Sequence, residues 1–159
     1  IFDVFWQDLD FLIIDMPPGT GDAQLTLSQK VQLAGAVIVS TPQDLSLIDA
    51  RKGINMFKKV NVPILGIIEN MSYFLCTKCK ERHYIFGNKG AKREAEKLGL
   101  PFLGEVPIDI NLRINSDEGT PLFLKDPKSS TSKVYSEISK NLLKTLEKNQ
   151  IKSPKILLN

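Results

Sequence analysis

The sequence has few of the features that several protein classes require. It contains two cysteines, one histidine and one tryptophan, and its apolar runs, such as 11–14 and 36–39, are short. Two cysteines cannot build a disulfide scaffold, and runs of this length are far from a membrane-spanning helix. Because Asp3, Asp8 and Asp10 interrupt the first residues, we expect no signal peptide there. The sequence predicts neither a disulfide-rich secreted domain nor a membrane-spanning one.

The remaining composition is that of an ordinary globular chain. Of 159 residues, 42% are hydrophobic and 25% are charged, with a formal net charge of +3, which suits one domain with its own core. The basic residues gather in 76–93 and 125–159, but no aromatic residues interleave the lysines of the tail. We interpret both segments as solvated faces and expect no nucleic-acid partner.

Four continuous apolar runs predict buried strands at 9–14, 36–40, 64–68 and 102–106. Continuous rather than alternating runs are typical of a parallel sheet that is covered on both faces. Apolar residues at helical spacing predict helices at 44–57, 91–98 and 134–146, with a weaker candidate at 21–33. We therefore predict an α/β fold with a doubly wound, mostly parallel sheet, in one domain over 1–150 with a loose tail at 151–159.

Asp15 follows the first apolar run, where an open α/β sheet binds ligands. A buried strand ending in Asp is typical of a Walker B segment, whose carboxylate orients water on Mg²⁺; the alternative is an Asp that caps the next turn. Gly19 and Gly21 then let backbone N–H groups approach an anion. A dinucleotide fingerprint is disfavoured because Gln24 stands where its third glycine belongs. No Gly-Lys dipeptide occurs, so the phosphate loop that accompanies Walker B is absent.

Cys76 and Cys79 form a C-x-x-C motif, whose spacing lets both thiolates face one metal centre. A zinc site or a cubane cluster needs four ligands. His83 could supply a third, or it could be a solvated residue. Two copies of the chain around a two-fold axis would supply four thiolates. A thioredoxin-like redox pair and two incidental cysteines remain open from the spacing alone.

In several segments the chain resembles the Mrp-type (ApbC-type) iron–sulfur carrier ATPases, relatives of the MinD and ParA partition ATPases. The resemblance runs through 9–22, 40–52, 66–87 and 101–109. The partition ATPases share the first part but lack the cysteine pair. The resemblance implies a P-loop NTPase-type fold whose N-terminal part is missing here, with a cluster-binding insert near 70–90.

The resemblance also implies roles for residues around the first strand. Asp15 would match the Walker B aspartate that orients the Mg²⁺ shell, and Asp22 would lie in the nucleotide-sensing switch. Gly19 would lie near the γ-phosphate of ATP. The family's phosphate loop would precede this strand. Because this chain lacks that loop, we expect no ATP hydrolysis by the chain alone.

Later segments match the rest of the family's site. Asn70 would contact the adenine edge, and Pro107 and Asp109 would lie along the base and ribose. Cys76 and Cys79 would bridge a [4Fe-4S] cluster between two protomers.

The implied function is an ATP-dependent iron–sulfur carrier that acts as a homodimer and delivers its cluster to apo iron–sulfur proteins. Free thiols suit a reducing compartment, so we expect the cytoplasm or, alternatively, the mitochondrial matrix. One alternative is a MinD- or ParA-like positioning ATPase, whose membrane-facing stripe would be Val134, Ile138, Leu142 and Leu146. We expect this stripe to pack on the sheet instead, without stable membrane association. Another alternative is a non-catalytic dimer bridged by zinc, which can occupy the same thiolates.

Overall fold

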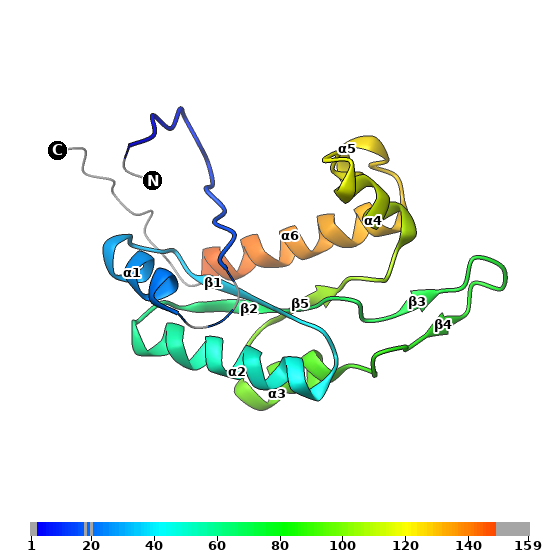
Figure 1. Ribbon diagram of the computed structural model, residues 1–159, viewed down its shortest axis with the longest axis horizontal. Coiled ribbons are helices and arrows are strands. Elements are labelled where there is room, and N and C mark those ends of the chain that lie inside the picture. The colour runs from blue at the N-terminus through cyan, green and yellow to red at the C-terminus, as the bar shows by residue number, and fades with distance from the viewer. Residues whose placement is uncertain (1–2, 18, 20, 149–159) are drawn as a thin grey trace.

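The computed structural model describes residues 3–17, 19 and 21–148, so the tail predicted at 151–159 lies outside the described residues. Its centre is a parallel three-stranded sheet in the order β1 (Ala36–Ser40), β2 (Ile64–Glu69) and β5 (Phe102–Glu105) (Figure 1). These are three of the four predicted strands. Their apolar runs suit this position because both faces of the sheet are covered.

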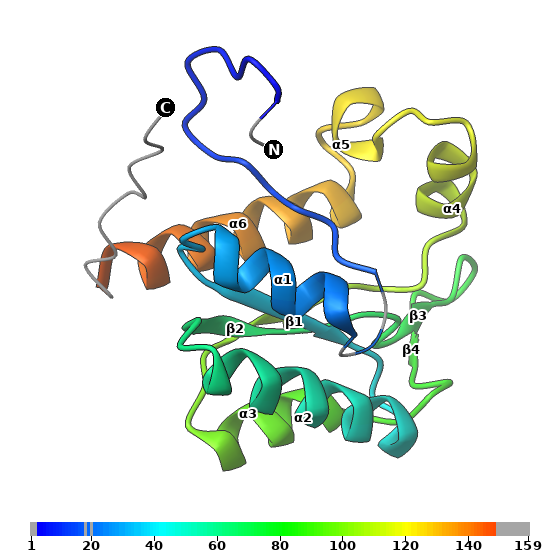
Figure 2. The same cartoon turned by 60° about the vertical axis from the view of Figure 1, so that its left-hand side comes forward.

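Helices cover the two faces of the sheet. On one face lie α2 (Asp44–Lys59) and α3 (Gly90–Leu98), and α6 (Ser130–Lys148) crosses the other, as Figures 1 and 2 show. The helix α1 (Asp22–Lys30) precedes β1. All four predicted helices are confirmed, and so is the α/β class. The helix α2 begins at Asp44, the predicted first residue, and Gln43 takes the cap position.

Two apolar clusters hold these layers together. One joins α2 and α3 to the sheet around Ile54 and Ile67, which are almost fully buried. The other joins α6 to β5 through Leu103 and Ile138, with Val134 and Leu142 packed against it. Full burial of such a side chain contributes about 1.5–3 kcal/mol. The apolar stripe of α6 therefore packs on the sheet, as expected. None of the described helices is both long and apolar enough to cross a membrane.

The strand predicted at 9–14 is wrong for this structure. Residues 9–14 form no strand, and Leu9, Phe11 and Ile13 are 53%, 61% and 87% exposed. A parallel strand needs a neighbour for its backbone hydrogen bonds and a covering layer for its side chains. Among the described residues, β1 pairs only with β2, so the run has neither.

Four short elements were not predicted. They are the two strands of an antiparallel hairpin, β3 (Phe74–Leu75) and β4 (Arg82–His83), and the helices α4 (Ile110–Asp117) and α5 (Leu122–Lys125). The hairpin extends beyond the end of the central sheet in Figure 1. Strands of two residues are too short to produce a recognisable apolar pattern.

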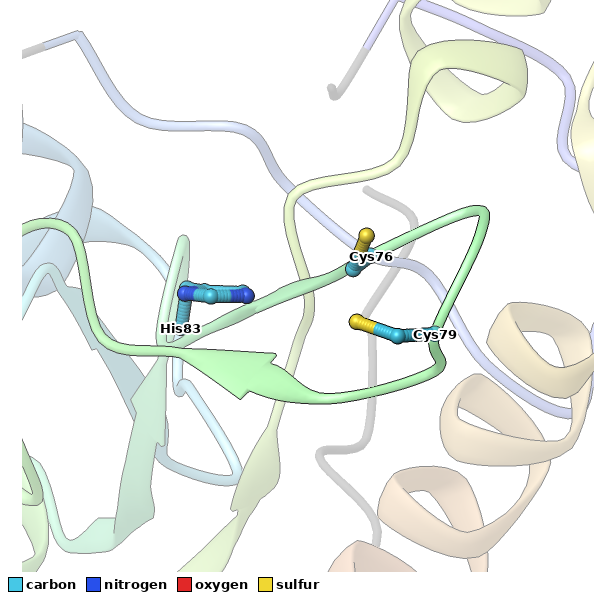
Figure 3. Close-up of side chains that lie close together, drawn as sticks. All are labelled: Cys76, Cys79 and His83. Atoms are coloured by element: carbon cyan, nitrogen blue, oxygen red, sulfur yellow. The ribbon is translucent and has the colours of Figure 1, made fainter.

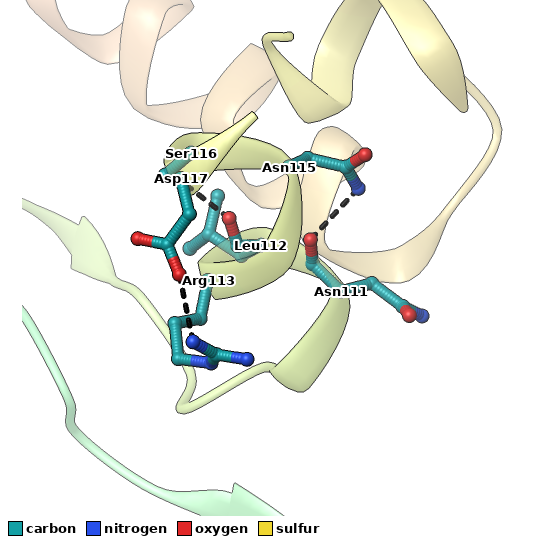
Figure 4. Close-up of polar contacts among 6 residues, drawn as sticks. All are labelled: Asn111, Leu112, Arg113, Asn115, Ser116 and Asp117. Carbon is teal, nitrogen blue, oxygen red and sulfur yellow. Dashed lines mark hydrogen bonds and ion pairs between the residues drawn. The ribbon is translucent and has the colours of Figure 1, made fainter. Parts of the chain in front are cut away.

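The helix α4 has several polar contacts of its own and only a weak apolar stripe, with Leu112 packed against the second apolar cluster, which explains why apolar periodicity missed it. Asp109 caps its start, with its carboxylate accepting the Asn111 backbone N–H at 2.8 Å. Asn115 and Ser116 each donate to a carbonyl one turn earlier, and Arg113 pairs with Asp117 (Figure 4). An N-cap of this kind stabilises a helix by about 1 kcal/mol.

Candidate metal centre

The residues between β2 and α3, 70–89, form an excursion that we call the cysteine arm. It leaves the sheet after Glu69, the last residue of β2, and returns at the start of α3. Glu69 is fully buried, yet its carboxyl group has two partners. The Ser72 hydroxyl donates to Oε1 at 2.5 Å, and the Ala91 backbone N–H donates to Oε2 at 2.7 Å. One carboxyl group thus joins both ends of the arm, at a helix N-terminus that favours negative charge.

Backbone contacts hold the same place, which we call the arm root (residues 69–72 and 90–91). The Ser72 N–H donates to the Val106 carbonyl at 3.0 Å. Gly90 lies so close to the loop after β1 that a Cβ atom there would be 2.2 Å from the Pro42 carbonyl oxygen. The arm root is therefore tightly packed against the carboxyl end of the sheet.

The other end of the arm, the arm tip (residues 76–83), is a hairpin loop with its return strand. Its ends are joined by the Cys76 N–H, which donates to the Glu81 carbonyl at 2.9 Å. The Lys80 N–H donates to the Cys76 carbonyl at 3.0 Å, and Lys80 adopts a left-handed conformation with φ of 62°. Nearby, the Arg82 guanidinium lies 4.2 Å from the centre of the Tyr73 ring, a cation–π contact that braces the hairpin.

The two cysteines lie at the arm tip as free thiols. Cys76 is half-buried and Cys79 is exposed. Hydrogen bonds from the backbone of Cys79, and then of Lys78, lower the pKa of the Cys76 thiol below its ordinary value. Because the thiolate is the form that binds metal, the loop favours the ligand form of Cys76.

The structure brings His83 to the cysteine pair. The ligand atoms of Cys76, Cys79 and His83 all lie within 4.8 Å of one another, and Figure 3 shows the three side chains at the end of the hairpin. In the part of the chain that the structure describes, no other group of three His, Cys, Asp or Glu side chains comes together in this way. The sequence left two interpretations of His83: a third ligand or a solvated residue. The His83 side chain is exposed, but it lies beside both cysteines, and this position favours the ligand.

The donor set suits zinc or an iron–sulfur cluster. Thiolate sulfur binds zinc and iron–sulfur clusters, and both usually require four protein ligands. One chain offers two thiols, so two chains supply a set of four. The arm tip is exposed, so ligands from outside the chain can reach the thiols.

Three of the residues matched to a nucleotide site follow the neighbouring strands β2 and β5 at the carboxyl end of the sheet. Asn70 follows β2, and its backbone N–H donates to the Ser40 carbonyl at 2.8 Å. Pro107 and Asp109 follow β5, which lies beside β2. Asp109 already has partners, because its carboxylate caps α4 and accepts a short hydrogen bond from the Thr131 hydroxyl. Pro107 and Asp109 line a cavity of about 490 Å³ between the arm and α6.

The other three residues of that set lie around the turn before α1. Asp15 and Gly19 are exposed, and Asp22 is the first residue of α1. Among the described residues, no hydrogen bond of Asp15, Gly19 or Asp22 reaches Asn70, Pro107 or Asp109.

Sequence reasoning missed two buried polar residues at these sites. Gln24 in α1 is buried, and its side-chain amide donates to the carbonyls of Pro17 and Gly19 at 2.6 and 3.2 Å, so it holds the turn. Glu69 is the second, at the arm root. For Glu69 the available signal was its place at the end of an apolar run, because a buried polar group requires partners. Gln24 lies in no such run, so the sequence carried no comparable signal for it.

Known proteins match most of this chain. The family described as ParA, the NUBPL iron-transfer P-loop NTPases, matches residues 1–143. A Dictyostelium discoideum protein named iron-sulfur cluster transfer protein NUBPL is 57% identical over 142 residues, covering 89% of this chain and 44% of that protein. An Arabidopsis thaliana protein named iron-sulfur protein required for NADH dehydrogenase, mitochondrial, is 54% identical over 144 residues, covering 91% and 46%. The chain thus spans about half the length of the relatives it matches.

Solved structures support the fold. A nucleotide-binding protein from Archaeoglobus fulgidus, described in complex with ADP and with Co, is 49% identical with a TM-score of 0.64, covering 72% of this chain and 47% of that one. The cell division ATPase MinD of Pyrococcus furiosus, at 22% identity, has a TM-score of 0.55 and covers 70% and 43%; this second likeness concerns the fold alone. With the cysteine pair and the parallel sheet in place, the chain belongs to the family of NUBPL iron-transfer P-loop NTPases.

Proposed function

We propose that this chain carries an iron–sulfur cluster at the arm tip and delivers it to apo iron–sulfur proteins. In this proposal two copies each contribute Cys76 and Cys79 to one [4Fe-4S] cluster. The observation that carries it is the position of the pair: free thiols at the exposed end of an arm whose root is buried. The names of the relatives, an iron–sulfur cluster transfer protein among them, support the same function.

The exposed tip suits transfer rather than storage. A cluster moves between proteins when thiolates of the recipient replace those of the carrier, and this exchange needs access to the metal. Lys78, Lys80 and Arg82 surround the pair with positive charge, which offsets the negative charge of a thiolate-bound cluster.

ATP with Mg²⁺ is the proposed second ligand in the intact protein. Asp15 and Asp22 would serve the Mg²⁺ shell and the switch, Gly19 the γ-phosphate, and Asn70 the adenine edge, with Pro107 and Asp109 along the base and ribose. The Archaeoglobus fulgidus protein described in complex with ADP supports nucleotide binding. Because Asn70 directly follows Glu69, a nucleotide at this edge would touch the arm root. Nucleotide state would then bias the arm and the cluster it carries.

The expected partners are a second copy and a recipient apoprotein. The α6 stripe packs on the sheet, which favours this function over that of a membrane-positioning ATPase. One relative is named as mitochondrial, so the matrix stands beside the cytoplasm as the proposed compartment. A zinc-bridged dimer is the second candidate, because the same four thiolates suit zinc.

Anaerobic reconstitution tests the proposal. The purified full chain is incubated with iron and sulfide, and the visible absorbance, the iron and sulfide content and the mass in solution are measured. We expect one cluster per two chains, its transfer to an apo [4Fe-4S] protein, and the loss of both in Cys76→Ser and Cys79→Ser. Thr77→Ser in the same loop is the matched control and should retain the cluster. A colourless zinc-bound dimer without cluster uptake would favour the second candidate.

A further inference from the structure

His83 adds a third donor to a site for which the cysteine pair alone gives only two. β3 and β4 pair antiparallel, with Phe74 opposite His83. Side chains alternate between the two faces of a strand. His83 therefore lies on the same face of the hairpin as Phe74 and Cys76. This register explains why one histidine ring and two sulfur atoms come within 4.8 Å of one another.

We propose that Cys76, Cys79 and His83 of a single chain bind one divalent transition metal ion, with a fourth coordination position open. The inference rests on the proposed function only because it uses the same cysteine pair. It makes His83 a metal ligand, whereas a cluster bound by four cysteines needs no histidine. Each thiol gives up its proton on binding, and the imidazole binds as the neutral ring. The resulting site has no net charge.

The geometry allows this with small side-chain movements. Zinc–sulfur bonds of about 2.3 Å and zinc–nitrogen bonds of about 2.0 Å place the ligands of a tetrahedral ion roughly 3.5–3.8 Å apart. The three donors therefore have to approach by about 1 Å. Cys79 and His83 are exposed, so side-chain rotation can supply this movement without a change in the buried arm root.

Three protein ligands and one open position are typical of sites that exchange a ligand, whereas structural zinc sites are closed. An incoming thiolate can therefore bind the metal before any ligand of this chain leaves. A borderline ion such as Zn²⁺, Co²⁺ or Fe²⁺ suits two thiolates and one imidazole. The chain would then have two loading modes: one ion per single chain, and one cluster per two chains.

Cobalt titration of the reduced full chain measures the first mode. We expect one Co²⁺ per chain that remains monomeric, with the visible bands of a tetrahedral ion and thiolate charge transfer. His83→Ala should weaken binding by about 100-fold or more, because loss of a ligand costs at least as much as loss of a residue that only orients one. Thr77→Ser, a conservative change in the same loop, is the control and should leave the affinity unchanged. His83→Cys should restore tight binding with stronger charge transfer.

A second measurement reports ligation directly. His83 is the only histidine in the chain, so ¹⁵N-labelled imidazole gives the signals of one ring. On addition of Zn²⁺, one ring nitrogen should shift in proportion to the bound metal. If cobalt affinity is the same in His83→Ala, or if the ring signals do not move while zinc binds, the inference is wrong and the carrier function still stands. If His83→Ala loses the ion but no cluster forms even in the unchanged chain, the carrier function fails and the three-ligand site stands.

Discussion

The two ends of the cysteine arm differ in almost every physical respect. At the arm root, Glu69 and Ser72 are fully buried and hydrogen-bonded to each other. At the arm tip, Cys79 and His83 are exposed and close to each other. The root belongs to the core, so changes there should cost folding free energy. The tip belongs to the surface, so changes there should alter metal binding with little effect on stability.

Separation of this kind suits a carrier. A site that exchanges its cargo needs mobile, accessible ligands, but those ligands must also return to the same place. A buried root supplies the fixed position and an exposed tip supplies the access. The four changes below test this division, from the largest expected effect to the smallest.

Glu69→Ala should have the largest effect. It removes the acceptor for the Ser72 hydroxyl and the Ala91 N–H, and each buried donor left without a partner costs about 1–3 kcal/mol. We expect a loss of about 4 kcal/mol in the free energy of unfolding, measured by urea denaturation. Glu96→Ala, an exposed change on α3, is the control and should be nearly neutral. Equal effects of the two would mean that the arm root is not buried in solution.

Gly90→Ala comes next, because its Cβ would lie 2.2 Å from the Pro42 carbonyl oxygen. Backbone has to shift to relieve this contact, at a cost of about 3 kcal/mol. The control is Gly53→Ala in α2, where a Cβ would meet nothing within 4 Å. That change should stabilise the chain by about 1 kcal/mol through helix propensity. Opposite signs in thermal unfolding are the expected result, and equal signs would contradict the packing at Gly90.

The third prediction concerns acid stability beside the arm root. Glu94 in α3 is buried and accepts two hydrogen bonds from Arg51 in α2, at 2.6 and 2.9 Å. The hydrogen bonds and charge of Arg51 lower the pKa of Glu94. A carboxyl group whose pKa is lower in the folded state stabilises that state above its unfolded pKa, and this contribution is lost as the pH falls through the folded pKa.

Glu94→Gln should therefore be less stable than the parent chain near neutral pH. The difference should shrink as the pH falls below about 4, where unpaired carboxylates become protonated. Urea denaturation across this pH range measures it. Asp117→Asn, in an exposed pair with Arg113, should change little at any pH. If the difference in unfolding free energy between Glu94→Gln and the parent chain stays constant with pH, the charge of Glu94 is not the cause of that difference.

The smallest effect is expected at the arm tip. Lys80 has a φ of 62°, a conformation that glycine adopts without strain. Lys80→Gly should stabilise the chain by about 0.5–1 kcal/mol in urea denaturation. Lys78→Gly, in the same loop, is the matched control and should give no stabilisation. If Lys80→Gly instead destabilises the chain, the left-handed conformation of Lys80 carries no strain.

Much of the fold could be predicted because its signals are local. The runs 36–40, 64–68 and 102–106 became β1, β2 and β5, since each is mainly apolar and is followed by a polar residue or proline. The predicted end of the third helix at residue 98 is also confirmed, and the structure gives the next residue, Gly99, a left-handed conformation that glycine adopts without strain. The run 9–14 carries the same signal and forms no strand, because pairing depends on a neighbouring strand as well as on the run itself.

The sequence by itself determined the α/β class and the pair of thiols, because apolar runs, helical spacing and the C-x-x-C motif are contained within short segments. Only the tertiary structure decided that Glu69 joins both ends of the arm and that His83 lies beside Cys76 and Cys79. Ala91 is 22 residues from Glu69, and the place of His83 depends on the hairpin register. A register shift of one residue would turn His83 to the opposite face of the hairpin, so no local pattern could have placed it.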